Sequence, residues 1–224
     1  MKMYYYSVQP QVSHGYPGGY WGFQTPRYYS GQWSYPSYRR NPSGITKSAL
    51  ELSNTIRKLW EQHTVWTRAT IVSLVFDLPD ASFVTNRLLQ NPVDFGNLFS
   101  IYYGDRAGTK LSDLLRDHLV IAAELVKAAK AGDNEAAVEI EKRWYTNGDQ
   151  IAAFLGSINL YWSEEVWRRM IRMHLDLVKT EAVTLITGNY QEEGSIYDQL
   201  ETQALEMADV MTQGIIRQFP ARFR

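Results

Sequence analysis

From Gly44 onward, apolar residues recur three and four positions apart, and no segment alternates apolar and polar residues as a strand does. The first such stripe includes Leu52, Ile56 and Leu59, which fall on one face of a helix. This periodicity predicts five long helices, at about 45–76, 106–131, 134–156, 164–187 and 196–218, with two short helices within 81–103. The predicted fold class is all-α, an antiparallel up-and-down bundle of four to five long helices joined by short loops.

The expected helix ends depend on turn and cap signals. Pro79 follows the end of the first helix, and Gly188 ends the fourth long helix. Ser163 is the expected N-cap of that fourth helix. Ser195 with Asp198 resembles a capping box, which places the start of the last helix at about 196.

Residues 1–43 differ from the rest of the chain in composition. They contain four basic residues and no acidic one, nine of the fifteen tyrosines and five of the eight prolines, but neither Leu nor Ile. A segment without these residues cannot build an aliphatic core, so we expect a disordered Tyr/Gly/Pro-rich tail over 1–43 and a helical-bundle domain over 44–224. Aromatic residues among Gly and Pro favour weak multivalent contacts, which makes the tail a candidate for self-association or for binding other proteins. A floppy extension without a role is the alternative.

Composition also excludes several classes of function. The 224 residues include no cysteine, so a thiol nucleophile, a disulfide framework and Cys-ligated zinc or iron–sulfur are excluded. The net charge is −1 and no predicted helix is strongly basic, so nucleic-acid binding is not expected. No apolar run is long enough for a membrane span, and no signal peptide is visible, which predicts cytoplasmic synthesis. No catalytic-triad elbow or phosphate-loop spacing is present, so a non-enzymatic role is favoured.

Three histidines form the strongest candidate site. His63, His118 and His174 each take the place of an aliphatic residue on the inward stripe of a different predicted helix. Each lies fourteen residues before the expected end of its helix, which corresponds to about 21 Å. If the three helices run parallel, their imidazoles share one layer. The sequences Arg-Asp-His-Leu around His118 and Arg-Met-His-Leu around His174 also suggest that two helical hairpins repeat with an offset of 56 residues.

A layer of three neutral imidazoles suits a mononuclear metal site. Three such nitrogen ligands bind zinc, iron or copper and leave one coordination position open. A carboxylate is expected beside such a site, and Glu181 is the candidate, although it lies about 10 Å along the helix from His174. The other polar residues expected near the layer are Tyr145, Asp149, Glu206 and Asp209.

The competing interpretation is a buried polar network that fixes the register of the bundle. In this interpretation, Thr67 and Glu181 are the expected hydrogen-bond partners of the histidines. The chain has no Glu-x-x-His or His-x-x-x-Glu pair, so ferritin-like and haemerythrin-like sites are not supported. The cluster of Arg168, Arg169 and Arg172 is expected to form a solvated face paired with helix acids, with an anion or partner site as the alternative.

Several stretches between about 58 and 220 resemble a family of uncharacterised helical proteins from spore-forming bacteria. The matching stretches are Leu-Trp-Glu-Gln-His at 59–63, Trp-Thr-Arg at 66–68, Tyr-Tyr-Gly at 102–104, Asp-His-Leu-Val-Ile-Ala-Ala-Glu-Leu at 117–125, Ala-Ala-Lys-Ala-Gly-Asp-Asn at 128–134, Arg-Trp-Tyr at 143–145 and His-Leu-Asp-Leu at 174–177. Members often bear names borrowed from unrelated enzymes, so the resemblance implies little chemistry. The composition of 1–43 is similar to that of Tyr-rich segments in spore-coat and surface-layer proteins.

The residues and the resemblance together predict a non-enzymatic binding or structural bundle that is associated with the spore or the cell envelope. Its aromatic tail would mediate assembly with copies of itself or with other coat or surface proteins. The alternative is a mononuclear metal-binding bundle with a storage, redox or hydrolytic role at His63, His118 and His174.

Overall fold

A computed structural model describes residues 44–224, which form seven α-helices and a short 3₁₀ helix, without a strand. In chain order these are α1 (Lys47–Val75), α2 (Ala81–Leu88), α3 (Gln90–Tyr103), α4 (Asp105–Ala131), α5 (Asn134–Ile158), α6 (Glu164–Ile186), α7 (Tyr190–Gln218) and η1 (Pro220–Phe223). The all-α prediction is confirmed, as are the two short helices within 81–103. The tail expected over 1–43 lies outside the described residues.

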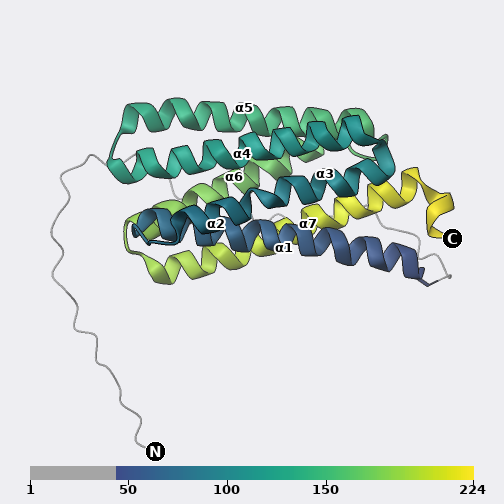
Figure 1. Ribbon diagram of the computed structural model, residues 1–224, viewed down its shortest axis with the longest axis horizontal. Helices are drawn as coiled ribbons and strands as arrows, with labels where there is room; N and C mark the ends of the chain where they lie inside the picture. Colours follow the sequence, from purple (N-terminus) through teal and green to yellow (C-terminus); the bar gives the residue numbers. More distant parts are fainter. Residues whose placement is uncertain (1–43) are drawn as a thin grey trace, which may run out of the picture. The chain divides into compact units, whose positions relative to one another are not determined.

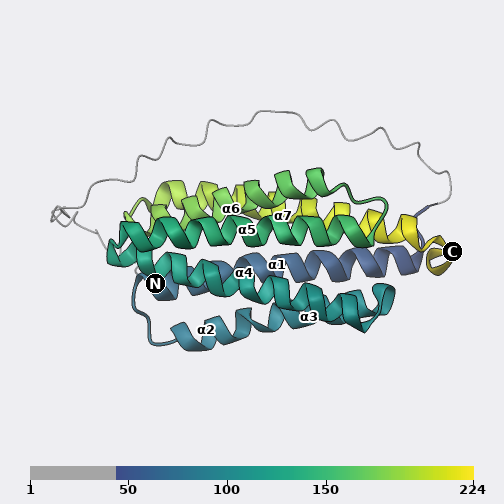
Figure 2. The same cartoon turned by 90° about the horizontal axis from the view of Figure 1, so that it is seen from above.

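The helices form three antiparallel hairpins around one core (Figures 1 and 2). Helices α1, α4 and α6 run in the same direction, and the chain returns through α2–α3, α5 and α7. The three parallel helices contact one another, and each returning arm packs between two of them: α3 between α1 and α4, α5 between α4 and α6, and α7 between α6 and α1. This arrangement places one face of α1, α4 and α6 at the centre of the bundle.

Each of the three parallel helices ends in the same way. The residue that terminates the helix adopts a left-handed backbone conformation in each case. Its φ is 52° at Asp77, 72° at Gly132 and 75° at Gly188. The backbone N–H of the next residue then bonds the carbonyl five positions back, in the pairs Leu78–Ser73, Asp133–Ala128 and Asn189–Thr184. This is the Schellman pattern. Glycine is common at its left-handed position because a residue without a Cβ adopts a positive φ without a steric clash. The matched ends confirm that the three helices stop at equivalent places.

The last helix starts earlier than expected. Helix α7 begins at Tyr190 and contains Ser195 and Asp198 in its interior, so the predicted capping box was wrong. The turn at Gly188 already ends α6, and the Asn189 carbonyl accepts the first helical hydrogen bond, from the N–H of Glu193. The other cap expected from the sequence is confirmed, because the Ser163 hydroxyl accepts a bond from the backbone N–H of Val166 (3.4 Å).

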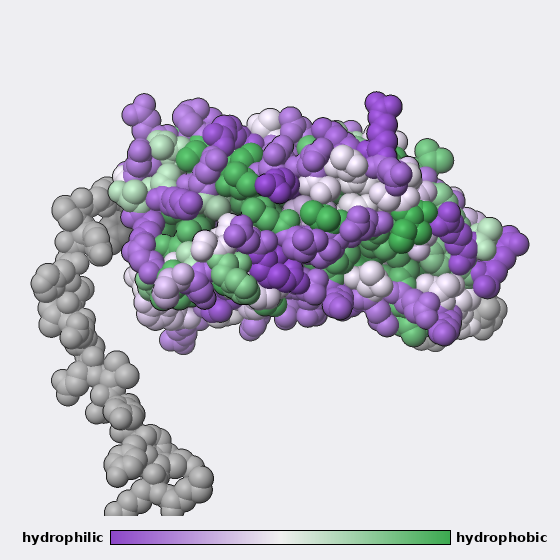
Figure 3. Space-filling model, viewed as in Figure 1, coloured by the Kyte–Doolittle hydropathy of each residue, from purple (hydrophilic) through white to green (hydrophobic). Residues whose placement is uncertain are grey.

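The interior is filled by large apolar side chains, among which Trp144, Trp167 and Phe99 are fully buried. The face seen in Figure 3 is mostly polar, with small apolar patches between the charged side chains. Within residues 44–224, no helix combines the length and apolarity needed to cross a membrane.

A candidate ligand site at the centre of the bundle

The three histidines line one small cavity at the centre of the bundle. The cavity has a volume of about 30 Å³, and His63, His118 and His174 are 4%, 5% and 3% exposed. They come from α1, α4 and α6, the three helices that run parallel and contact one another. The His63 and His174 ring centroids are 5.5 Å apart. The structure therefore brings together the three side chains that the sequence placed in one layer.

Each histidine is held by an amide from the returning arm of its own hairpin. The Nδ1 atoms lie 3.0–3.1 Å from an amide oxygen, in the pairs His63–Asn91, His118–Asn147 and His174–Gln203. Sequence reasoning missed these partners and expected Thr67 and Glu181 instead.

The amides also fix which ring nitrogen carries the proton. The Asn91 amide nitrogen donates to the Leu59 carbonyl, four residues before His63 (2.9 Å). Asn147 and Gln203 make the same contact to the carbonyls of Leu114 and Met170 (3.1 and 3.0 Å). Since the amide nitrogen is used as the donor, the amide oxygen accepts, and Nδ1 of the histidine must donate. The Nε2 atoms are then unprotonated acceptors.

Burial keeps all three rings uncharged. It lowers the pKa of His63 to about 4 and the pKa values of His118 and His174 to about 3, while the amide hydrogen bonds oppose the shift. Repulsion from the other histidines lowers the pKa of His118 and His174 further. Near neutral pH the rings are therefore neutral imidazoles, the form that binds metal ions.

The site is built from a unit that occurs three times. The amides at 91, 147 and 203 recur with an offset of 56 residues, and the histidines at 63, 118 and 174 follow nearly the same offset. The residues three before each histidine and four after each amide all line the cavity: Trp60, Leu115, Ile171, Phe95, Ile151 and Met207. The sequence indicates only two copies, because the first returning arm is broken into α2 and α3 and the residues around His63 in α1 do not match the motif.

The rest of the cavity wall is apolar, with two exceptions. The indole nitrogens of Trp60 and Trp167 are buried and have no hydrogen-bond partner. The thioether residues Met207 and Met211 lie one turn apart on α7 and also face the cavity. The donor atoms available inside are thus imidazole nitrogen, thioether sulfur and indole N–H, without a carboxylate.

The expected carboxylate partner was wrong. Glu181 is fully buried, but neither of its oxygens has a hydrogen-bond partner, and its nearest charge is Arg68 Nε at 3.7 Å. The Thr67 hydroxyl also lacks a partner. Amides occupy the place that a carboxylate was expected to fill. Among residues 44–224, no three His, Asp or Glu side chains are grouped so as to hold one metal ion.

The other polar residues expected near the histidine layer are used elsewhere. Tyr145 donates to the Asp176 carboxylate, and Asp209 accepts a bond from Arg57 (2.7 Å). Asp149 pairs with an arginine of α6, as described below, and Glu206 does not line the cavity.

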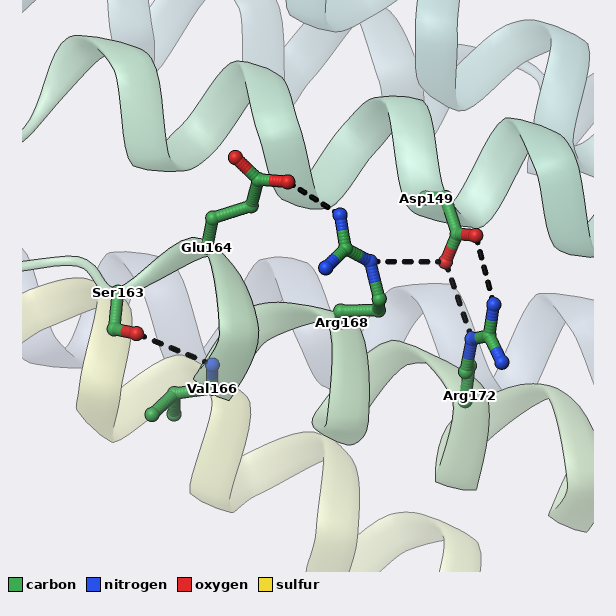
Figure 4. Close-up of polar contacts among 6 residues, drawn as sticks. All are labelled: Asp149, Ser163, Glu164, Val166, Arg168 and Arg172. Atoms are coloured by element: carbon green, nitrogen blue, oxygen red, sulfur yellow. Dashed lines mark hydrogen bonds and ion pairs between the residues drawn. The ribbon is translucent and has the colours of Figure 1, made fainter.

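The arginine cluster on α6 is paired with acids. Arg172 bonds both oxygens of Asp149 (3.1 and 2.8 Å), and Arg168 reaches Asp149 and Glu164 (Figure 4). Arg169 pairs with the Glu165 carboxylate (2.5 Å). This confirms the expected face of charge pairs, and the guanidinium groups of these arginines already have carboxylate partners.

Glu181 is a fully buried carboxylic acid that does not line the cavity. Burial raises its pKa to about 8, repulsion from Glu193 adds to the rise, and Arg68 opposes it. The folded protein therefore keeps this carboxyl protonated at pH values where the unfolded chain has released the proton. Since the folded state then binds more protons, its stability falls as pH rises from about 4.5 to about 8.

Replacing Glu181 by glutamine should stabilise the protein, and most strongly at alkaline pH. Glutamine matches the neutral form, so it removes the cost of ionising a buried group, up to about 4 kcal/mol at pH 9. Urea unfolding at pH 5, 7 and 9 measures the effect. Glu193→Gln is the matched control and should destabilise, because Glu193 accepts two hydrogen bonds from Arg68 (2.7 and 3.0 Å). Equal effects of Glu181→Gln at all three pH values would show that Glu181 is ionised in the folded protein.

No family model, no curated protein and no solved structure matches the chain.

Proposed function

We propose that the protein is a non-enzymatic bundle that binds one metal ion in its central cavity and assembles through its aromatic tail. The observation that carries the proposal is that three buried imidazoles, each bonded through Nδ1 to an amide oxygen, line one cavity. Metal-binding histidines commonly donate their other ring N–H to an oxygen acceptor in this way.

The dimensions of the cavity support binding over catalysis. About 30 Å³ is the space of one water molecule or one ion. Sites for organic substrates are about ten times larger. The site also has no carboxylate beside the histidines that would act as a general base. We therefore infer storage or retention of an ion.

Assembly through the tail rests on composition and on the resemblance to proteins of spore-forming bacteria. The tail carries four positive charges and the remainder of the chain a net charge of −5, so contacts between neighbouring copies are electrostatically favoured. Spore-coat or surface-layer proteins are the other proposed partners. Sedimentation of the full chain beside a variant with all nine tail tyrosines changed to serine tests this part. Equal sedimentation of both would contradict it.

A purely structural role for the histidines is the second candidate. It is favoured by the complete hydrogen bonding of each Nδ1 atom and by the absence, among residues 44–224, of a preformed group of three ligands. A buried network of this kind fixes the register of a bundle.

Thermal unfolding of the full chain with zinc, iron(II) or copper(I), each tested alone, separates the two candidates. An ion present at a hundred times its Kd stabilises the folded state by about 2.7 kcal/mol, which raises Tm by about 5–10 °C for a chain of this size. His63→Gln should abolish the shift. His14→Gln, which changes a histidine of the tail, should leave it intact. If no ion raises the Tm of the unaltered protein, the histidines are a structural network.

A further inference from the structure

Resting on the proposed function, we propose that the ion is cuprous copper, bound by His63 and His174 together with a thioether of Met207 or Met211.

The donor atoms of the cavity select for a soft ion. Magnesium and calcium require oxygen ligands, and no carboxylate or hydroxyl lines the cavity. Zinc sites are built from three or four protein ligands, and no three His, Asp or Glu side chains are so grouped among residues 44–224. Thioether and imidazole ligands suit copper(I), which is stable with two or three ligands. A pair of histidines and one methionine is therefore sufficient.

The arrangement of the helices brings these donors to the wall of one cavity. His63 and His174 come from α1 and α6 and have the ring separation of 5.5 Å. Helix α7 packs against both α1 and α6, and it is the helix that carries Met207 and Met211. Both methionines are 2% exposed and face the cavity that the two histidines line.

His118 is held differently from the other two. Its ring stacks on Trp144 (5.3 Å between centroids), and the Trp144 indole donates to the backbone carbonyl of His118 (3.1 Å). The Trp60 ring meets both His63 and His174 edge-on, at 5.5 and 6.1 Å. The aromatic grouping therefore separates a His63–His174 pair from His118, which leaves His118 as a third ligand or as a neighbour of the bound ion.

The apolar surroundings also favour an ion with one positive charge over an ion with two. The desolvation cost of a buried ion grows with the square of its charge, and no buried carboxylate lines the cavity to neutralise a second charge. Trp60 and Trp167 also line the cavity, and aromatic rings attract cations.

The test uses the full chain, prepared free of metal and titrated anaerobically with copper(I) in competition with a coloured copper(I) chelator. We expect one copper per chain. Met207→Leu with Met211→Leu should weaken binding by about tenfold or more because both thioethers are lost. Met170→Leu is the matched control, since Met170 is buried in α6 but does not line the cavity, and it should leave the affinity unchanged. Gln203→Leu, which frees His174, should weaken binding by about 10- to 100-fold.

X-ray absorption at the copper edge keeps the test independent of variant stability. The unaltered protein should show both nitrogen and sulfur neighbours. Copper bound without a sulfur neighbour, or equally tight binding by the double methionine variant, would overturn the proposal. If the protein retains zinc but not copper(I) under matched competition, the copper proposal is overturned and the proposed function still stands. Failure of copper(I), zinc and iron(II) to bind would overturn both.

Discussion

Gly214→Ala should be among the most damaging single substitutions in the bundle, at about 2–4 kcal/mol. A Cβ atom at Gly214 would lie 1.8 Å from Trp162 Nε1 and 2.5 Å from Trp162 Cδ1. The indole would have to move and would lose its hydrogen bond to the Val210 carbonyl (3.2 Å) and its edge contact with Trp167 (5.9 Å). Overpacking costs about 1–3 kcal/mol by itself, and the lost hydrogen bond adds about 1 kcal/mol or more.

Replacing Gly194 by alanine should have the opposite effect on the free energy of unfolding. Gly194 lies in the same helix, is exposed, and has no atom within 4 Å of the position a Cβ would take. Alanine there should stabilise by about 0.5–1 kcal/mol, because glycine is a poor helix former. Urea unfolding followed by circular dichroism measures both variants. If Gly214→Ala changes stability as little as Gly194→Ala does, α7 does not pack on Trp162 as described.

Asn147→Leu should destabilise the protein by about 1–3 kcal/mol, although the two side chains are similar in size. The change removes the acceptor for the Nδ1–H of His118 and the donor to the Leu114 carbonyl, both of which are buried. A buried donor left without a partner carries its full desolvation cost. His118 is then also free to move its proton to Nε2, which would turn that atom from an acceptor into a donor.

A double-mutant cycle isolates this interaction. Adding His118→Leu to Asn147→Leu should recover part of the loss, because removing both polar partners is less costly than removing one. Gln150→Leu on the exposed side of α5 is the control and should change stability by no more than about 0.5 kcal/mol. A single Asn147→Leu variant as stable as the control would mean that the amide does not hold His118.

The sequence predicted the helices and the layer of three histidines because both follow from local periodicity. A side chain on the inward stripe faces the core whatever it packs against, and turn residues such as Gly132 and Gly188 mark where each helix ends. The histidine partners depend instead on pairing between helices. Asn91, Asn147 and Gln203 lie 28 or 29 residues from their histidines, and no local rule connects them.

The first hairpin lacks the sequence features that identify the other two. Its left-handed turn residue is Asp77 rather than glycine, and its returning arm is broken into two short helices. The third copy of the unit is therefore hidden to a search for similar residues, although the regular offset between the amides would have revealed it. Glu181 was misassigned for another reason: it lies on the inward face of α6, but the pairing of the helices directs it toward Arg68 and away from the histidines.

Nitrogen-15 NMR of the histidine side chains in the metal-free full chain is the decisive test of the proposed ligand site. It reports which ring nitrogen carries the proton. We expect His63, His118 and His174 to be neutral at pH 6 and protonated on Nδ1, with three unprotonated Nε2 atoms. Protonation of the buried rings on Nε2, or their titration near pH 6.5, would contradict the claim that the three histidines are neutral and have unprotonated Nε2 atoms.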